Sequence, residues 1–442
     1  MPTSTPPEPV RDMGELRHRL ERGARPAAQH RVGLEHEKVS VLADGSAPTY
    51  EGAIAPLLER LAEGAGWRRV MEGDHVIALE RGTASVSLEP GGQFEFSDEP
   101  RATARACAEV LDAHLAELTG PAAALGIQWL ACGFRPLGTL DEVPWMPKGR
   151  YAVMREYLPR RGRLGHEMMK RTTTVQANLD FADEADCAEK MRVGMGITSL
   201  VTALWANSPL VDGRPAGYQS YRAACWLEMD DDRCGLLPFV FEAGLETQLF
   251  RRYAEWALDV PMFFVHRRGQ YLPAGGMTFR RFLAEGFHGE RATMADWELH
   301  LSTLFPEVRL RPYIEMRAAD AGTRGMVKAL PALYRGLLYD GEARRAAWEL
   351  VAGWSFAERQ ALRRDVPRRG LAAEVRGQRI HDRCRALVEI ARAGLARLGD
   401  DTTLLDPVLE VAETGRTYAD RMLAAYQAAG GDVAAFIAAI RL

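Results

Sequence analysis

The chain has few cysteines and no pattern that would organise them. The six cysteines among 442 residues are scattered, with no C-x-x-C pair and no Cys/His cluster at zinc spacing. Free thiols in a reducing compartment are therefore expected. The short separation of Cys225 and Cys234 leaves a disulfide open, because spacing alone does not decide it.

The sequence also lacks the common nucleotide and hydrolase motifs. It contains no G-x-x-x-x-G-K-[ST] loop and no G-x-S-x-G motif. Gly194-Met-Gly196 lacks the third glycine and the preceding strand of a dinucleotide-binding fingerprint. Any nucleotide site must therefore be built from a sheet and its metal ions.

Neither a basic excess nor a long apolar run is present. The formal net charge is −4, which argues against nucleic acid as a partner. No run of 18 apolar residues occurs, so no membrane span is expected. Residues 1–10 are rich in Pro, Thr and Ser and lack the apolar segment of a secretory signal. We expect a cytoplasmic protein whose first nine residues are disordered.

The most informative stretch is Val86-Ser-Leu-Glu-Pro-Gly-Gly-Gln-Phe-Glu-Phe96. It predicts two short strands separated by a Pro-Gly-Gly break. Alternation places Gln93 and Glu95 on one face, near Glu89, and the two phenylalanines on the core face. An isolated pattern of this kind most often faces solvent.

The same pattern recurs in other strand-like segments, which favours a functional interpretation. Polar or charged residues at i, i+2 spacing share one face in three further segments: Glu35 and Glu37; Gln176, Asn178 and Asp180; Glu315 and Arg317. Clustered carboxylates repel one another unless cations neutralise them, and oxygen-only ligands suit Mg²⁺ or Mn²⁺. The sequence therefore predicts a sheet whose concave face is a magnesium–phosphate site.

The rest of the chain is divided by composition. We expect an N-terminal tail and short helix in residues 1–29, a catalytic core in 30–330, and a helical part packed on it in 331–442. A helix is predicted for 102–118, ended by Gly120-Pro121. The long segment 135–170 is predicted to be irregular, and its Lys148 and Arg150 suit carboxylate or phosphate oxygens.

Taken in order, these segments resemble the glutamate–cysteine ligases of the plant and proteobacterial type. The resemblance covers about residues 30–317 and is specific because many motifs match together. They are Val32-Gly-Leu-Glu-His-Glu-Lys38, Leu88-Glu-Pro-Gly-Gly-Gln-Phe-Glu95, Pro147-Lys-Gly-Arg-Tyr151, Thr174-Val-Gln-Ala-Asn-Leu-Asp-Phe181, Ala206-Asn-Ser-Pro209, Asp232-Arg-Cys-Gly235, Leu237-Pro-Phe-Val-Phe241, Ala257-Leu-Asp-Val-Pro-Met262, Leu304-Phe-Pro-Glu-Val-Arg-Leu310 and Glu315-Met-Arg317.

The resemblance implies an α+β fold, with a curved antiparallel β-sheet of about six strands flanked by helices and a helical C-terminal part. It implies ATP- and Mg²⁺-dependent ligation of the glutamate γ-carboxylate to the amine of cysteine, the first step of glutathione synthesis, with Mn²⁺ as a possible substitute. Glutamate, cysteine or another amine, and ATP would be the small-molecule partners of a monomer or homodimer.

The resemblance also implies roles for particular residues. The candidate metal ligands are Glu35, Glu37, Glu89, Glu95 and Glu315, with Gln93, Gln176 and Asn178 as polar neighbours that fix metal or phosphate oxygens. Arg150 and Arg222 would hold substrate carboxylates, in a substrate site that includes Tyr221, Trp226, Gln93 and Lys148. Arg317 and Arg171 would contact the transferred phosphoryl group, with Glu315 beside them.

The chain departs from the family pattern in two loops. Ala224, Leu227 and Met229 stand where relatives usually carry His, Thr and Thr, and Arg324 stands in place of a Trp. If these residues line the acceptor pocket, they predict an amine other than cysteine, because lost polar groups shift specificity. Ordinary sequence drift is the alternative.

Overall fold

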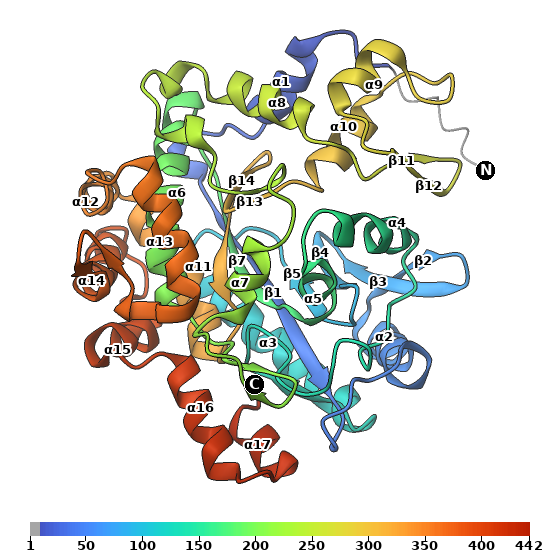
Figure 1. The fold of residues 1–442 in the computed structure, drawn as a ribbon, viewed down its shortest axis with the longest axis vertical. Helices are drawn as coiled ribbons and strands as arrows, with labels where there is room; N and C mark the ends of the chain where they lie inside the picture. Colours follow the sequence, from blue (N-terminus) through green and yellow to red (C-terminus); the bar gives the residue numbers. More distant parts are fainter. Residues whose placement is uncertain (1–8) are drawn as a thin grey trace.

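A nine-stranded sheet forms the centre of the computed structural model, which describes residues 9–442 (Figure 1). The strand order is β14-β15-β7-β1-β5-β4-β3-β2, and β6 pairs with β1. All of these pairs are antiparallel. The strands are β1 (Val32–Val41), β2 (Arg68–Glu72), β3 (His75–Arg81), β4 (Ala84–Leu88), β5 (Phe94–Ser97), β6 (Gln128–Leu130), β7 (Thr174–Leu179), β14 (Val308–Leu310) and β15 (Ile314–Asp320). The predicted antiparallel sheet is confirmed, with more strands than expected.

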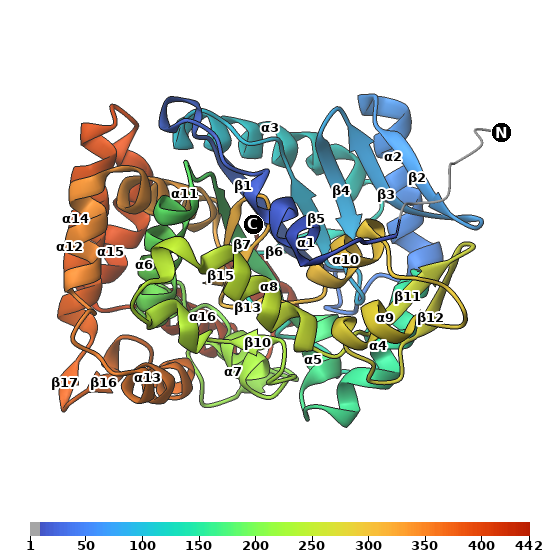
Figure 2. The same ribbon diagram turned by 90° about the horizontal axis from the view of Figure 1, so that it is seen from above.

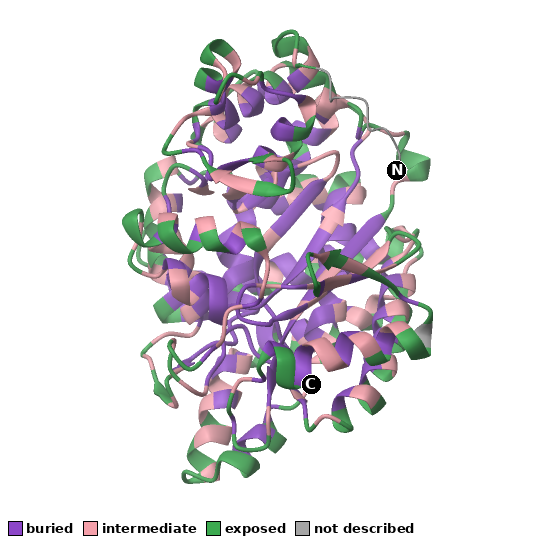
Figure 3. Cartoon of the chain, turned by 90° about the vertical axis from the view of Figure 1, so that its right-hand side faces the viewer, coloured by how far each residue is buried: buried purple, intermediate pink, exposed green. Residues whose placement is uncertain are grey.

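Alternation along β1 creates two different faces of the sheet. Val32 and Leu34 pack in the hydrophobic core, whereas Glu35 and Glu37 point the other way and are only partly buried. The phenylalanines of β5 likewise pack into the core with Trp129. The central strands form the buried interior of the molecule (Figure 3).

Helices cover both faces of this sheet, as Figure 2 shows with α3 on one side of the central strands and α5 and α7 on the other. They are α1 (Met13–Glu21), α2 (Ala55–Ala65), α3 (Ala104–Ala123), α4 (Gly149–Tyr157), α5 (Gly165–Arg171), α6 (Glu184–Leu204), α7 (Tyr221–Leu227), α8 (Leu249–Asp259), α9 (Phe279–Glu285) and α10 (Met294–Leu301). Short two-stranded pairs lie outside the main sheet: β8 (Leu210–Val211) with β9 (Arg214–Pro215), β10 (Cys234–Gly235) with β13 (Phe305–Pro306), β11 (Phe264–Arg267) with β12 (Gln270–Pro273), and β16 (Glu374–Val375) with β17 (Gln378–Arg379).

Two expectations about helices were wrong. Helix α3 continues through Gly120-Pro121, because a proline near the C-terminal end removes only one backbone donor and the amides of Ala124 and Leu125 still bond to earlier carbonyls. The segment 135–170 contains α4 and α5 instead of being irregular. The first amide of α4, that of Gly149, donates to Glu72 Oε1 at 2.7 Å, a contact between residues distant in the sequence.

The C-terminal part is helical, as expected, and packs beside the sheet (Figure 1). Its helices are α11 (Arg324–Tyr339), α12 (Gly341–Glu349), α13 (Phe356–Arg369), α14 (His381–Arg397), α15 (Asp406–Thr414), α16 (Tyr418–Ala429) and α17 (Val433–Ala439). Helix α11 spans residue 330, and the division of the chain at that point remains a prediction.

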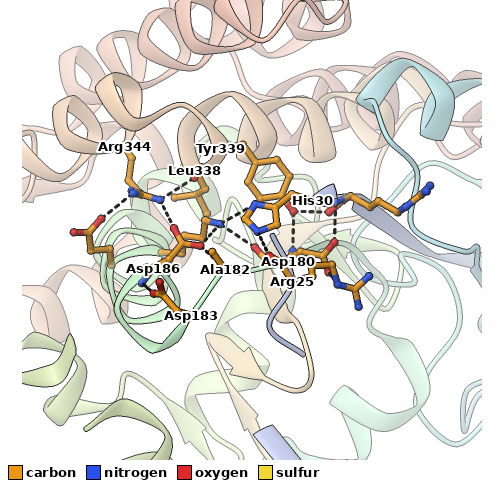
Figure 4. Close-up of polar contacts among 12 residues, drawn as sticks. Arg25, His30, Asp180, Ala182, Asp183, Asp186, Leu338, Tyr339 and Arg344 are labelled. Atoms are coloured by element: carbon orange, nitrogen blue, oxygen red, sulfur yellow. Dashed lines mark hydrogen bonds and ion pairs between the residues drawn. The ribbon is translucent and has the colours of Figure 1, made fainter. Parts of the chain in front are cut away.

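A buried polar network fixes the start of β1 against the end of β7 (Figure 4). The hydroxyl of Tyr339 accepts from the amide of Asp180 at 2.7 Å and donates to the carbonyl of Arg31. Lys190 donates to the Asp180 carbonyl at 3.0 Å and to the Asp186 carboxylate at 2.6 Å. The network therefore satisfies the backbone where the register of the two central strands begins.

Two other features concern the residues from 9 onward. All six cysteines lie there as free thiols, and five of them are buried. None of the helices in this part of the chain has the length and apolar character needed to cross a bilayer. The first eight residues, for which disorder was expected, lie outside the described part.

The close contact between α11 and α14 generates a stability prediction. A Cβ on Gly336 would lie 2.2 Å from the carbonyl oxygen of Ala391, so Gly336→Ala must push the helices apart. We expect it to lower the free energy of unfolding by about 1–3 kcal/mol or more. The control is Gly64→Ala at an exposed site in α2 with no atom within 4 Å of the new Cβ. It should stabilise by about 0.5–1 kcal/mol. Urea unfolding measures both, and equal effects would contradict the packing account.

Candidate active site

A cavity of about 230 Å³ lies over the face of the sheet that carries the predicted acidic residues. Its wall includes residues from strands β1, β5, β7, β14 and β15 and from helices α4, α5 and α7. Ten predicted site residues line it: Glu35, Glu37, Glu89, Gln93, Glu95, Arg150, Gln176, Arg222, Trp226 and Arg317. The structure thus brings together residues that are up to 282 positions apart in sequence.

Strand register places the carboxylates in neighbouring positions. Glu37 of β1 lies directly across from Glu95 of β5, and Glu35 lies across from Gln176 of β7. Directly opposed residues on antiparallel strands have Cβ atoms only about 5 Å apart. The side-chain amide of Asn178 donates to Glu35 at 2.7 Å, and the Ser87 hydroxyl donates to Glu95 at 2.8 Å.

These carboxylates are short of neutralising charge. Burial, together with the charges of Glu315 and Glu95, raises the pKa of Glu35 to about 7. Burial and the charges of Glu89 and Glu95 raise the pKa of Glu37 well above its usual value. The pKa of Glu95 is raised too, first by burial and then by Glu89. The face is therefore poised to accept positive charge.

Glu315 has a different environment from the other glutamates. Burial alone would raise the pKa of this carboxylate, but Arg309 and Arg317 lower it to about 2. Arg309 contacts both carboxylate oxygens, at 2.7 and 2.8 Å, and Arg317 contacts one of them. Arg317 also donates to Gln176 at 2.9 Å. Glu315 thus organises two arginines at the cavity wall.

The donor set fits a divalent cation that is shared with a phosphorylated ligand. Within residues 9–442, no three acidic, histidine or cysteine side chains converge tightly enough to enclose an ion alone. Mg²⁺ is usually held by one or two carboxylates together with substrate phosphates, so a complete protein cage is not required. The side-chain oxygen of Asn178 is buried without a hydrogen-bond partner among the described residues. It is therefore a further, uncharged oxygen ligand next to Glu35.

The opposite end of the cavity is less polar. Tyr151, Met154, Met168 and Met169 line it beside Arg150. The turn below them is fixed by Gln93, whose side chain accepts from the Gly91 amide at 2.9 Å and donates to the carbonyls of Met169 and Thr172. Lys148 donates to the Leu88 carbonyl at 2.7 Å and lines a separate groove on the outer side of α4.

Five predicted site residues do not line the cavity: Asn178 and Glu315, which contact residues that do line it, and Lys148, Arg171 and Tyr221. Arg171 is fully buried below it, where its guanidinium contacts Asp212 at 2.7 Å and the Gly138 carbonyl at 2.8 Å. The expectation that Arg171 contacts the phosphoryl group is therefore corrected, because its terminal nitrogens are held outside the cavity by partners distant in the sequence, and its Nε is buried without a partner among the described residues. Tyr221 packs its ring on Phe134, away from the carboxylates.

The positions that depart from the family pattern also lie mostly elsewhere. Ala224 and Met229 are buried in the core, and Arg324 is exposed at the start of α11. Leu227 lines a small neighbouring cavity behind Trp226. None of the four lines the cavity described above, and their effect on the choice of amine stays a prediction.

Sequence reasoning missed two arginines of the cavity wall. Arg309 and Arg311 lie on and just after β14, two positions apart, and both line the cavity. Their i, i+2 spacing could have indicated that both share one face of the sheet. The same spacing separates Glu315 and Arg317 on the neighbouring strand.

The fold is similar to that of a solved bacterial enzyme. The match is to the glutamate–cysteine ligase of Francisella tularensis, crystallised in complex with AMP, with a TM-score of 0.55. It covers 93% of this chain and 87% of that one at 12% sequence identity. At this identity the likeness shows the fold alone.

Plant enzymes are similar in sequence over almost the whole chain. Chloroplastic glutamate–cysteine ligases of Brassica juncea and Arabidopsis thaliana are each 44% identical over 417 residues, or 93% of this chain. The alignments cover 80% and 79% of those proteins. An enzyme of Oryza sativa, chloroplastic glutamate–cysteine ligase B, is 42% identical over 92% of the chain and 82% of its own length.

The chloroplastic location of these relatives contradicts the expectation of a cytoplasmic protein, which is wrong on this comparison. The expectation was based on the lack of an apolar segment in residues 1–10, a feature that bears on secretory signals alone. Organelle import signals are amphipathic and need no apolar run, so that absence could not establish the compartment.

The family assignment rests on nearly the full length of the chain. The model of glutamate-cysteine ligase family 2 matches residues 31–439, which includes every strand of the central sheet and all residues of the cavity wall. By this match and by the identity to the plant enzymes, the chain belongs to glutamate-cysteine ligase family 2.

Proposed function

We propose that this protein joins the γ-carboxylate of glutamate to the amine of cysteine and consumes ATP in doing so. One observation carries the proposal: a cavity in which unneutralised glutamates of one sheet face arginines of the same sheet. The proposed substrates follow from the names of the relatives, and the cavity residues are suited to binding anions and a cation.

The reaction requires two anions to meet. A carboxylate is a poor electrophile, so ATP converts it to an acyl phosphate, and the amine of the second substrate then displaces phosphate. Arg317 and Arg222 are the residues proposed to hold oxygens of the glutamate and of the transferred phosphoryl group. Their positions are coupled, because Arg222 donates to the Arg317 carbonyl at 2.9 Å. Catalysis would come from positioning and charge stabilisation, with no covalent enzyme nucleophile.

Bound Mg²⁺ would supply positive charge that lets the nucleotide phosphates approach the glutamates. Glu35, Glu37, Glu89 and Glu95 are the residues proposed to hold it, with Gln176 and Asn178 next to them. Glu315 joins this set only if it releases Arg309 or Arg317. Thr174 orients Glu37 through its backbone amide, which donates to the carboxylate at 3.1 Å.

Arg150 is the residue proposed for the carboxylate of the amine substrate. It lies at the apolar end of the cavity, and its buried Nε has no partner among the described residues. The methionine side chains around it provide a polarizable wall that suits a small thiol. This environment favours cysteine over a large or strongly charged amine.

The substrates are tested by phosphate release. The purified protein with ATP, Mg²⁺ and glutamate should release phosphate rapidly on addition of cysteine, and at least tenfold more slowly with alanine, serine or 2-aminobutyrate at equal concentration. Removing glutamate should abolish release, because no carboxylate is then activated. A different amine that outperforms cysteine at limiting concentration would contradict the proposed acceptor.

The proposed metal site predicts a change in stability as well as in activity. Because the pKa of Glu35 is raised to about 7 from 4.5, its contribution to stability is full below pH 4.5 and lost as pH rises through 7. Without metal, Glu35→Gln should therefore raise the free energy of unfolding at pH 8 by about 1–3 kcal/mol, and change it little at pH 4.5. Turnover should fall at least a hundredfold.

The control for this variant is the exposed Glu389→Gln in α14. It should leave stability and turnover unchanged at both pH values. Adding Mg²⁺ at pH 8 should raise the melting temperature of the wild type more than that of Glu35→Gln. A variant that is destabilised at pH 8, or that keeps full turnover, would exclude Glu35 from a cation site.

A further inference from the structure

Two of the arginines in the cavity wall are unpaired. The wall contains Arg150, Arg222, Arg309, Arg311 and Arg317. Arg309 and Arg317 bind Glu315, and Arg222 binds the Arg317 carbonyl. The guanidinium groups of Arg150 and Arg311 make no hydrogen bond or ion pair with any residue from 9 onward.

The strand order places these two free guanidinium groups at opposite ends of the cavity. Arg311 follows β14, the edge strand of the sheet. Arg150 lies between Lys148 and Tyr151, which both donate to the Leu88 carbonyl at the end of β4. Figure 1 shows α4 beside β4 and β14 on the other side of the central strands. Strands β15, β7, β1 and β5 lie between them, and three of these, β15, β1 and β5, carry glutamates of the site.

The two ends differ in the charge that they offer. At the Arg150 end, Tyr151 and methionines stand beside the carboxylates of Glu89 and Glu95, so a ligand there meets one guanidinium with free donors, which matches a single carboxylate with a small side chain. At the Arg311 end, β14 and β15 contribute Arg309 and Arg317, and Ser302 follows the end of α10. A triphosphate chain carries up to about four negative charges and binds where several cations and metal ions converge.

Arg311 is the member of that group with free donors. Arg309 uses Nε and one terminal nitrogen for Glu315, and its other terminal nitrogen for the carbonyls of Ser302 and Leu304 at 3.2 Å. Arg317 is held by Glu315 and Gln176. A ligand entering this end therefore meets one guanidinium that breaks no existing contact when it binds.

We propose that Arg311 binds the polyphosphate chain of the nucleotide, and that the nucleotide occupies the β14 end of the cavity while the amino acid substrates occupy the Arg150 end. The assignment rests on the proposed function for the identity of the nucleotide. The charge distribution along the cavity determines which end it takes.

The test compares Arg311→Gln with Arg150→Gln in kinetics and in direct binding. Arg311→Gln should raise the KM for ATP and the Kd for Mg-ADP, measured by isothermal titration, about ten- to hundredfold, and should change the KM for glutamate less than threefold. The Mg-ADP affinity of Arg311→Lys should lie between those of the wild type and Arg311→Gln, because lysine keeps the charge but loses the bidentate geometry. Arg150→Gln should raise the KM for an amino acid substrate and leave Mg-ADP affinity unchanged.

Arg324→Gln is the matched control, since Arg324 is exposed and does not line the cavity. All variants should keep the wild-type melting temperature within a few degrees. If Arg311→Gln does not fold, the same comparison is made with Arg311→Lys. The proposal is overturned if nucleotide affinity stays within twofold of wild type, or if the change appears in the KM for glutamate instead.

The binding measurements test the role of Arg311 independently of the proposed function. If the wild type releases no phosphate with glutamate and cysteine, the proposed function fails. Titration with Mg-ADP and with inorganic tripolyphosphate then still decides the role of Arg311. Weaker binding of both probes by Arg311→Gln supports the polyphosphate site. Equal binding by wild type and variant, or no binding by the wild type, overturns it.

Discussion

The repulsion between partly buried carboxylates on one face of the sheet is the constraint on which the rest of the structure depends. Glu37 and Glu95 are directly paired across strands, and Glu35 lies two residues before Glu37 on the same face of β1. Each has a raised pKa because burial removes water that would otherwise stabilise its charge. This arrangement costs stability in the empty protein, and bound cations would return that stability when substrates are present.

The surrounding structure holds the carboxylates in place in spite of this cost. On the core side, Leu34 and the phenylalanines of β5 anchor the same strands by burial. At the start of β1, Tyr339 and Lys190 satisfy the backbone around Asp180, which fixes the register that places Glu35 opposite Gln176. At the other edge, Arg309 and Arg317 neutralise Glu315, so the two sides of the cavity differ in charge.

Much of the site could be predicted because strand alternation is a local property. The spacing of Glu35 and Glu37, and of Gln93 and Glu95, indicated which side chains share a face, and the cavity contains all four. Roles in metal and substrate binding remain predictions. Contacts between distant segments could not be predicted: Arg171 is held by Asp212, and α4 begins where Gly149 meets Glu72. The position of Arg324 could not be predicted either. Its place in sequence beside the Glu315 motif did not show that it begins α11 with an exposed side chain.

The central claim is that the acidic face is a divalent-cation site, and the most direct test is calorimetric titration of Mn²⁺ in two buffers of different ionisation enthalpy. Because Glu35 has a pKa of about 7, binding at pH 6.5 must displace protons. We predict net proton release at pH 6.5 that diminishes by pH 8, and that is reduced in Glu35→Gln. Binding that releases no protons, or that is equally tight in the variant, would contradict the account.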